Sequence, residues 1–195
     1  LSVVLSTHVS EMEILDLIKP LRSPLFVKPA KGGSSIGIIR VADHRDVPAA
    51  VTEALAHDNK VIVEEAVDGF EVGCAIVGNG SLIVCEVDEI EIHDGFFDYE
   101  EKYTMKTSRI FMPARLDHDT AERIKETAVK IFRTLQCSGL ARVDMFLTPD
   151  KQIVFNEVNT LPGLTRHSRF PNMLKGIGMS FEQTMDTVIG LAMVK

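Results

Sequence analysis

The spacing of apolar and polar residues along the chain predicts short strands separated by a few helices. Residues 25–28 form an apolar run typical of a strand, and residues 36–41 form a second run that returns after a glycine-rich segment. These two runs predict a hairpin with a long, flexible tip. The opening of the chain, before this hairpin, shows no clear element of its own.

Three segments repeat apolar residues at intervals of three and four, which predicts helices. They are residues 46–57, residues 119–136 and, roughly, residues 181–193. Ser180 stands where the last helix begins, and Gln183 completes a capping box with it. The start of this helix is therefore predicted together with its length.

Five further runs have the length and composition of strands, and turn residues separate neighbouring runs. They are residues 60–67, 70–79, 82–91, 141–148 and 152–160. Apolar and acidic residues alternate in the third of these runs, which predicts that one face of the sheet is solvated there.

The order of these elements predicts an α+β fold, with helices packed on antiparallel sheets. The βαβ alternation of a Rossmann fold is missing. The glycine loop matches neither GxGxxG nor GxxxxGK[ST], so the sequence supports neither a dinucleotide fold nor a Walker loop.

Composition narrows the class of protein further. A net charge of -7 argues against general nucleic-acid binding, and no apolar run approaches the roughly 20 residues that span a bilayer. The three cysteines lie in apolar runs without CxxC spacing, so we expect them reduced and mostly buried. The opening residues lack the features of a signal peptide, and the cytoplasm is the expected compartment.

The first candidate for chemistry is the stretch LFVKPAKGGSSIGI, residues 25–38. Backbone N–H groups of its small residues can converge on an anion, and Lys28 would add a positive charge beside a phosphate. A flexible hairpin tip with a surface lysine is the alternative, and the loop alone does not separate the two.

The second candidate lies on the last predicted hairpin. Arg142 and Asp144 are two residues apart on one strand, and Glu157 and Asn159 are two apart on the next, so each pair shares a face. Charged residues on an otherwise apolar hairpin are costly unless they bind something, and oxygen ligands favour magnesium. The alternative is a satisfied salt-bridge network between Arg142 and the two acids.

Six motifs stand in order along the chain: KPAKGGSSIG, VEEAVDGFEV, FFDYEEKY, GLARVD, FNEVNTLPG and HSRFP. With them the chain resembles the D-alanine–D-alanine ligase family of the ATP-grasp superfamily from about Pro24 to its end. The resemblance implies the ATP-grasp fold. It also implies domains at residues 1–67, part of the central subdomain, and at residues 68–195, the C-terminal subdomain.

The resemblance implies ATP as a cofactor. Lys28 would contact the α- and β-phosphates, Glu64 and Val67 would hold the adenine, Glu71 would bind the ribose, and Phe146 would pack on the adenine. The full set of implied nucleotide-binding residues is Lys28, Gly33, Ser34, Ser35, Glu64, Glu65, Val67, Glu71, Phe96, Lys102, Phe146 and Asn156.

It also implies a metal site and a reaction. Two magnesium ions, or manganese, would be held by Asp144, Glu157 and Asn159. The implied catalytic residues are Arg142, Gly163, Lys102 and Ser34. The implied substrate residues are Tyr103, Arg142, Gly163, Ser168 and Arg169. ATP would phosphorylate D-alanine to an acyl phosphate, and the amine of a second D-amino acid would attack it.

The match departs from the family in two places. Leu1 falls inside the family's central domain, so we expect a fragment whose full-length parent forms homodimers. Arg169 in HSRFP stands where the biosynthetic ligases tend to have leucine. With an arginine at this position, the motif is similar to that of the vancomycin-resistance branch. The retained Lys102 and Tyr103 disfavour D-lactate as the second substrate. D-serine is therefore the expected acceptor, and D-alanine is the second candidate. Another ATP-grasp carboxylate–amine ligase and a non-catalytic nucleotide-binding remnant stay open.

Overall fold

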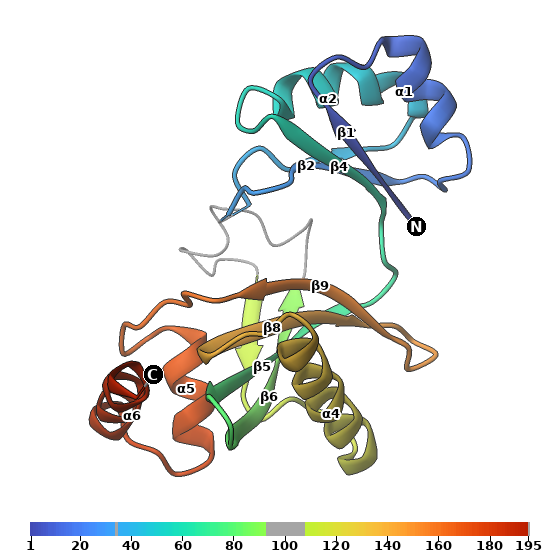
Figure 1. Ribbon diagram of the computed structural model, residues 1–195. Helices are drawn as coiled ribbons and strands as arrows, with labels where there is room; N and C mark the ends of the chain where they lie inside the picture. Colours follow the sequence, from blue (N-terminus) through green and yellow to red (C-terminus); the bar gives the residue numbers. More distant parts are fainter. Residues whose placement is uncertain (34, 93–107, 195) are drawn as a thin grey trace. The chain divides into compact units, whose positions relative to one another are not determined.

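The computed structural model describes residues 1–33, 35–92 and 108–194, and the chain divides into two compact units (Figure 1). Residues 1–67 belong to the first unit. Residues 68–92 and 108–194 belong to the second. Each unit has its own sheet and its own buried apolar residues.

The first unit is a four-stranded antiparallel sheet in the order β1-β4-β2-β3. Its elements are β1 Ser2–Ser6, α1 Glu11–Ile18, β2 Leu25–Pro29, β3 Ile39–Val41, the 3-10 turn η1 His44–Asp46, α2 Val47–Ala54 and β4 Lys60–Glu65. Apolar residues of α1 and α2 form one core with every second residue of β2 and β4. Both helices therefore cover the same face of this sheet.

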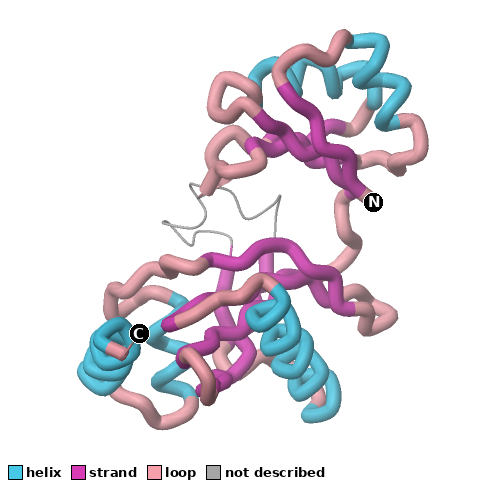
Figure 2. The backbone as a smooth tube through the Cα atoms, in the orientation of Figure 1, coloured by secondary structure: helices cyan, strands magenta, loops and turns pink. Residues whose placement is uncertain are grey.

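The second unit is a five-stranded antiparallel sheet in the order β7-β6-β5-β8-β9. Its elements are β5 Phe70–Gly78, β6 Leu82–Ile92, β7 Ser108–Phe111, α4 His118–Thr134, β8 Gly139–Leu147, β9 Ile153–Asn159, α5 Arg169–Gly176 and α6 Phe181–Met193. One core lies under α4, and a separate core lies under α5 and α6 (Figures 1 and 2). Helices therefore cover both faces of this sheet.

The predicted α+β class is confirmed. The hairpin of residues 25–28 and 36–41 is present as β2 and β3, although β3 begins only at Ile39. The last helix spans Phe181–Met193 with the capping box of Ser180 and Gln183 in place. The helix predicted over 46–57 is shorter, because η1 occupies its first turn.

Among the described residues, four helices and strands were not predicted from the sequence: β1, α1, β7 and α5. The strand and helix at the start of the chain are well formed, so the expectation that the opening has no element is wrong. In α5, Phe170, Met173 and Leu174 are fully buried at helical spacing, but the segment is only 8 residues long and contains Pro171.

The expectation of a solvated face on residues 82–91 is wrong over its second half. Asp88 and Glu89 point to opposite faces of β6 and both are buried, with 1% and 5% exposure. Each carboxylate is covered by an arginine that lies far away in the sequence.

Cys74 and Cys85 are buried and Cys137 is partly buried, and all three are free thiols, as expected. Burial raises the pKa of both buried thiols, that of Cys85 to about 12, so they are packing residues and not nucleophiles. None of the helices in the described ranges is long and apolar enough to cross a membrane.

Candidate functional site

In the first unit, Lys28 and Glu64 form an ion pair on the sheet face opposite the helices. Leu25, Val27 and Pro29 of β2 are buried in alternation, so Lys28 projects from the other face. Lys28 Nζ lies 2.6 Å from Glu64 Oε1 on β4, and both side chains are only partly exposed. A nucleotide that used both residues would have to replace this ion pair.

The glycine loop follows β2 directly. A Cβ on Gly33 would meet nothing within 4 Å, whereas a Cβ on Gly37, where φ is +73°, would lie 2.8 Å from the His57 ring. Ser35 also has a positive φ of 59°. The backbone path and the nearby His57 ring therefore favour glycine at position 37, whereas the backbone leaves room for a side chain at position 33; this is compatible with the phosphate hypothesis and does not test it.

Glu65 is turned toward a neighbouring loop. Its Oε1 accepts a hydrogen bond from the Arg22 backbone N–H at 2.9 Å, and this bond lowers the pKa of Glu65. Val67 follows the end of β4 and is partly buried. The nucleotide-binding roles of both residues stay predictions.

In the second unit, the strand register places charged residues in a row across four strands. Asp88 of β6 and Asp144 of β8 are both opposite Gly73 of β5, and Glu157 of β9 is opposite Asp144. The row is therefore Asp88, Gly73, Asp144 and Glu157. This juxtaposition joins two predicted metal ligands to one acid that the sequence analysis did not select.

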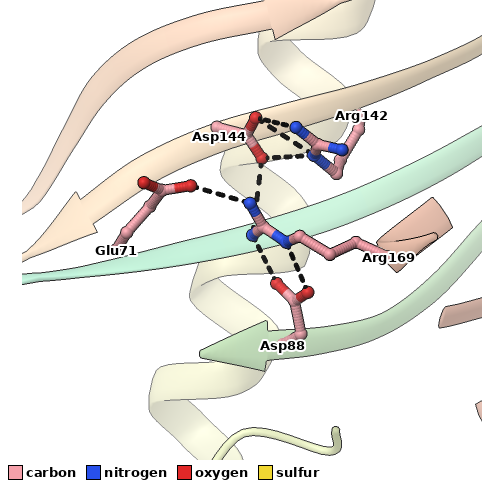
Figure 3. A network of polar contacts seen from close by, with 5 residues as sticks. All are labelled: Glu71, Asp88, Arg142, Asp144 and Arg169. Atoms are coloured by element: carbon pink, nitrogen blue, oxygen red, sulfur yellow. Dashed lines mark hydrogen bonds and ion pairs between the residues drawn. The ribbon is translucent and has the colours of Figure 1, made fainter. Parts of the chain in front are cut away.

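Arg142 lies one pleat away from Asp144 on the same face. Its Nε and Nη2 donate to the two Asp144 carboxylate oxygens at 2.7–3.0 Å (Figure 3). Asn159 is the cross-strand partner of Arg142. The salt bridge that was the alternative to a metal site is thus formed to Asp144.

The predicted residue Asn156 lies in a break of the strand register. Asp144 pairs with Glu157, whereas Met145 pairs with Phe155, so Asn156 is the extra residue of a bulge. Bulges beside functional sites re-aim side chains, and this one lies next to Glu157.

Arg169, the first residue of α5, is the hub of the network in Figure 3. Its Nε and Nη2 donate to both carboxylate oxygens of Asp88 at 2.8 and 2.7 Å, and Nη1 donates to Glu71 at 2.7 Å. Nη2 also lies 3.6 Å from Asp144 Oδ1. Burial alone would lower the pKa of Arg169, but Asp88, Asp144 and Glu71 raise it well above its usual value.

Glu71 and Phe146 are cross-strand partners on β5 and β8. The Glu71 carboxylate is engaged by Arg169, so ribose binding would use a group already oriented by an ion pair. Phe146 is partly buried beside it. The register therefore brings together the predicted ribose and adenine residues of this unit.

Gly163 and Ser168 also lie together. A Cβ on Gly163 would lie 2.7 Å from Ser168 Oγ, so a side chain at position 163 would displace the Ser168 hydroxyl. The Ser168 hydroxyl accepts from the Thr165 backbone N–H at 3.2 Å and is 2.8 Å from the Thr165 hydroxyl. A hollow of about 450 Å³ lies nearby, and it is lined by Asp88, Ile110, Met112, His167, Arg169, Asn172 and Lys175.

The donor set fits magnesium bound together with a phosphate. Within the described ranges, no three His, Cys, Asp or Glu side chains are grouped to hold a metal by themselves. Asp144 and Glu157 face each other, and Asn159 follows two residues after Glu157. Two carboxylates and an amide oxygen suit magnesium, which takes its other ligands from water and substrate phosphates.

Some predicted residues lie outside the described part of the chain: Ser34, Phe96, Lys102 and Tyr103. Asp88 and Gly73 were missed. The available signal for Gly73 was a glycine inside the apolar run of a strand, which often marks a close approach to the backbone.

Comparisons with known proteins agree on one family. Residues 3–190 match the profile described as the C-terminus of D-Ala–D-Ala ligase. D-alanine–D-alanine ligase A of Chromobacterium violaceum is 42% identical over 180 residues, which cover 92% of this chain and 49% of that protein. Vancomycin C-type resistance protein VanC1 of Enterococcus gallinarum is 43% identical over 169 residues, which cover 87% of this chain and 49% of that protein.

A solved structure is also similar. The structure of VanG D-Ala:D-Ser ligase from Enterococcus faecalis matches with a TM-score of 0.88 and 54% identity, covering 98% of this chain and 56% of that chain. The chain thus spans about half the length of the curated relatives it matches.

Proposed function

The chain belongs to the D-alanine–D-alanine ligase family and has its ATP-grasp fold, and we propose that it forms the nucleotide- and metal-binding part of an ATP-dependent ligase. The ligase joins D-alanine to a second D-amino acid. The observation that carries this proposal is the row of Asp144 and Glu157 across β8 and β9, with Arg142 on Asp144. Such a cluster suits phosphoryl transfer, in which catalysis rests on positioning and charge.

For the nucleotide, we propose the residues that the family resemblance selects. Lys28 and the loop of Gly33, Ser34 and Ser35 bind the phosphates, and Glu64 leaves Lys28 to contact the adenine with Glu65 and Val67. In the second unit, Glu71 takes the ribose and Phe146 and Asn156 lie beside the adenine. The position of Lys28 and Glu64 on the sheet face opposite α1 and α2, where both side chains are partly exposed, supports this assignment.

For the metal and the reacting groups, Asp144, Glu157 and Asn159 hold the magnesium ions, of which the family has two. Bound magnesium would offset the phosphate charge and orient the transferred group. Arg142 and the Gly163 N–H stabilise the tetrahedral oxyanion, because preorganised donors act most strongly where charge develops. We assign Lys102 and Ser34 to the transferred phosphate, Tyr103 to the substrate and Phe96 to the nucleotide, as the family resemblance implies.

The reaction then has two steps. ATP transfers its γ-phosphoryl group to the D-alanine carboxylate, which gives an acyl phosphate and ADP. The acceptor amine then attacks that carbonyl, loses a proton and displaces phosphate. Excluding water protects the acyl phosphate from hydrolysis. The product serves peptidoglycan precursor synthesis in the cytoplasm, and the full-length ligase is a homodimer.

D-serine is the proposed acceptor. The similarity to the VanG D-Ala:D-Ser ligase and the position of Arg169 on the wall of the hollow beside Ser168 support it. D-alanine is the second candidate, because a D-alanine–D-alanine ligase is 42% identical. Dipeptide synthesis by the full-length ligase that carries this region separates the two. Preferred use of added D-serine over D-alanine is expected, and equal use of both would exclude the D-serine proposal.

The nucleotide site can be tested in the chain itself by thermal unfolding with ATP and magnesium. At about 100 times Kd, binding adds roughly 2.7 kcal/mol, which raises the Tm of a chain this long by about 5–10 °C. We expect this rise to need magnesium and to be lost in Glu157→Gln. Glu126→Gln, the same change on the exposed side of α4, should keep it.

Two other results of this thermal-unfolding experiment would each contradict a different part of the proposal. A chain that unfolds cooperatively without any rise would show that it does not bind the nucleotide by itself, which contradicts the proposed nucleotide site in this chain and the nucleotide-binding remnant alike. A rise that does not depend on magnesium would contradict the metal assignment of Asp144, Glu157 and Asn159 while leaving nucleotide binding in place.

A further inference from the structure

The glycine loop between β2 and β3, of which the structure describes residues 30–33 and 35–38, lies against the connection from α2 to β4 (Figure 1). The pairing of β2 with β4 ends at Pro29 and Val61, and the Ala30 N–H then donates to the Lys60 carbonyl at 2.9 Å. The next residue has left the sheet, so a strand partner no longer fixes the path of the loop.

Asp58, in the connection from α2 to β4, holds the outgoing limb of the loop. Its Oδ2 accepts a hydrogen bond from the Lys31 backbone N–H at 2.7 Å, and its Oδ1 accepts a longer one from the Lys60 N–H at 3.4 Å. The bond from Lys31 is the main cause that lowers the pKa of Asp58, so the acceptor is a carboxylate at neutral pH. Hydrogen bonds to a charged acceptor are stronger than those to a neutral one.

His57, the residue before Asp58, lies against the returning limb of the loop. Gly37 has a φ of +73°, and a Cβ on it would lie 2.8 Å from the His57 ring and 3.0 Å from the Pro29 ring. The returning limb therefore passes close to both rings, and glycine is the residue that allows this approach. Two neighbouring residues of one connection thus contact the two limbs of the loop.

The part of the loop assigned to the phosphates lies between these two contacts. A Cβ on Gly33 would meet nothing within 4 Å, so no packing fixes the chain there. The Ile36 N–H donates to the Gly33 carbonyl at 3.1 Å, and the Ile38 N–H to the Ser35 carbonyl at 3.4 Å, so both bonds stay inside the loop. The position of this part relative to the sheet therefore depends on how the two limbs are held.

We propose that Asp58 is a positioning residue for nucleotide binding: by accepting the Lys31 N–H, it keeps the glycine loop on the path along which the loop binds the phosphates. This inference rests on the proposed function, in which the loop is the phosphate site. A carboxylate repels a phosphate, so Asp58 cannot favour binding through its own charge. It acts through the backbone, because a loop that is on the binding path for only a fraction of the time binds more weakly by that fraction.

Two substitutions separate the hydrogen bond from the charge. Asp58→Ala removes both, whereas Asp58→Asn removes the charge and keeps an oxygen that can accept from the Lys31 N–H. Removing a negative charge from the neighbourhood of a phosphate tightens binding, and losing the hydrogen bond weakens it. The proposal therefore predicts weaker binding of ATP in Asp58→Ala, and binding at least as tight as that of the unmodified chain in Asp58→Asn.

Asp43 provides a matched control in the same unit. Its Oδ1 accepts a hydrogen bond from the Arg45 backbone N–H at 2.9 Å at the start of η1, and its carboxylate also pairs with the Arg45 guanidinium. It follows the far end of the hairpin, because Val41 at the end of β3 pairs with Leu25 at the start of β2. Asp43→Ala therefore removes a carboxylate that holds a backbone N–H, at a site away from the glycine loop.

The test measures the Kd of ATP with magnesium, and the Kd of adenosine, by NMR titration of the 195-residue chain, whose amide spectra also show whether each variant is folded. Asp58→Ala should raise the Kd for ATP by about 10-fold, the result of a competent fraction that falls to roughly one-tenth. It should leave the Kd for adenosine unchanged, because adenosine has no phosphate. Asp43→Ala should leave both constants unchanged.

Several results would overturn the positioning role and leave the proposed nucleotide site in place. In Asp58→Ala these are an unchanged or lowered Kd for ATP, or an equal loss of affinity for adenosine. ATP binding as weak in Asp58→Asn as in Asp58→Ala would assign the effect to charge, and equally weak binding in Asp43→Ala would assign it to general stability. Failure of the unmodified chain to bind ATP would instead overturn the proposed nucleotide site in this chain, and this inference with it.

Discussion

Gly73 decides, at the scale of single residues, whether the charged network can form. It lies in the middle of β5, where glycine normally weakens a strand and packs nothing. Here its hydrogen atom faces Arg169, Asp88 and Asp144, and a Cβ in its place would come closer to all three than van der Waals contact allows. The gain from three charge-assisted contacts offsets the loss of intrinsic strand stability.

Gly73→Ala should therefore disturb the network. We expect a loss of about 1–3 kcal/mol in the free energy of unfolding, the usual cost of overpacking a buried site. Urea denaturation measures it. Gly190→Ala, in the exposed middle of α6, meets no atom within 4 Å and should stabilise the chain by roughly 0.5–1 kcal/mol. A neutral Gly73→Ala would show that the guanidinium moves without cost.

The sequence predicts residue contacts well only when the partners are near in the chain. The pairing of Arg142 with Asp144 follows from their spacing of two on a strand, and it was one of the two alternatives. Asp88 was assigned to a solvated face, because its partner Arg169 lies 81 residues further along. Only the packing of α5 on β6 brings that arginine over the acid and makes burial possible.

At the scale of elements, capping residues in the sequence were the clearest indication of where helices begin. The capping box of Ser180 and Gln183 marks the observed start of α6. Ser10 and Glu13 form the same box at the start of α1, so the signal for this missed helix was in the sequence. α5 has no capping box, because Pro171 stands at its third position, and the side chain of its N-cap residue Ser168 makes no capping hydrogen bond.

The ionisation of Asp117, the N-cap residue of α4, makes the stability of the folded state depend on pH. Its carboxylate accepts from the Thr120 N–H and hydroxyl at the start of α4 and from Lys151 Nζ, and Lys151 and Thr120 hold its pKa below the usual range. A depressed pKa stabilises the folded state above the unfolded-state value of about 3.9, and this stabilisation is lost as pH falls through the folded-state pKa.

Asp117→Asn keeps a capping oxygen but cannot ionise. We expect the variant to be less stable than the unmodified chain near neutral pH, and the difference to shrink as the pH falls below about 4. Urea unfolding at a series of pH values measures both curves. Parallel curves across that range would show that the ion pair with Lys151 contributes nothing.

At the scale of the whole molecule, the class of fold could be predicted from the sequence, because it depends on the order of elements and not on their contacts. Alternating runs and turn residues are local signals, and they were enough for an α+β fold with antiparallel sheets. The strand order β7-β6-β5-β8-β9 could not be predicted in this way. It requires β8, more than 60 residues after β5, to pair beside it, and no local signal specifies such a long-range pairing.

Because the two units have separate cores, we expect each unit to unfold locally without the other. Among the described residues, each apolar cluster belongs to a single unit: Ile18 packs with the first sheet and Phe132 with the second. Ile18→Ala should cost about 2–5 kcal/mol and Phe132→Ala about 3–5 kcal/mol, each in its own unit.

Native-state hydrogen exchange measures this division, because it reports the opening free energy of each amide separately. Ile18→Ala should lower the protection of amides in β2 and β4 while leaving β5 and β8 unchanged, and Phe132→Ala should do the reverse. Each variant is thus the control for the other. If either substitution lowered protection equally in both sheets, the two cores would open as one cooperative unit, and the pairing of Lys28 with Glu64 would depend on the fold that holds Asp144.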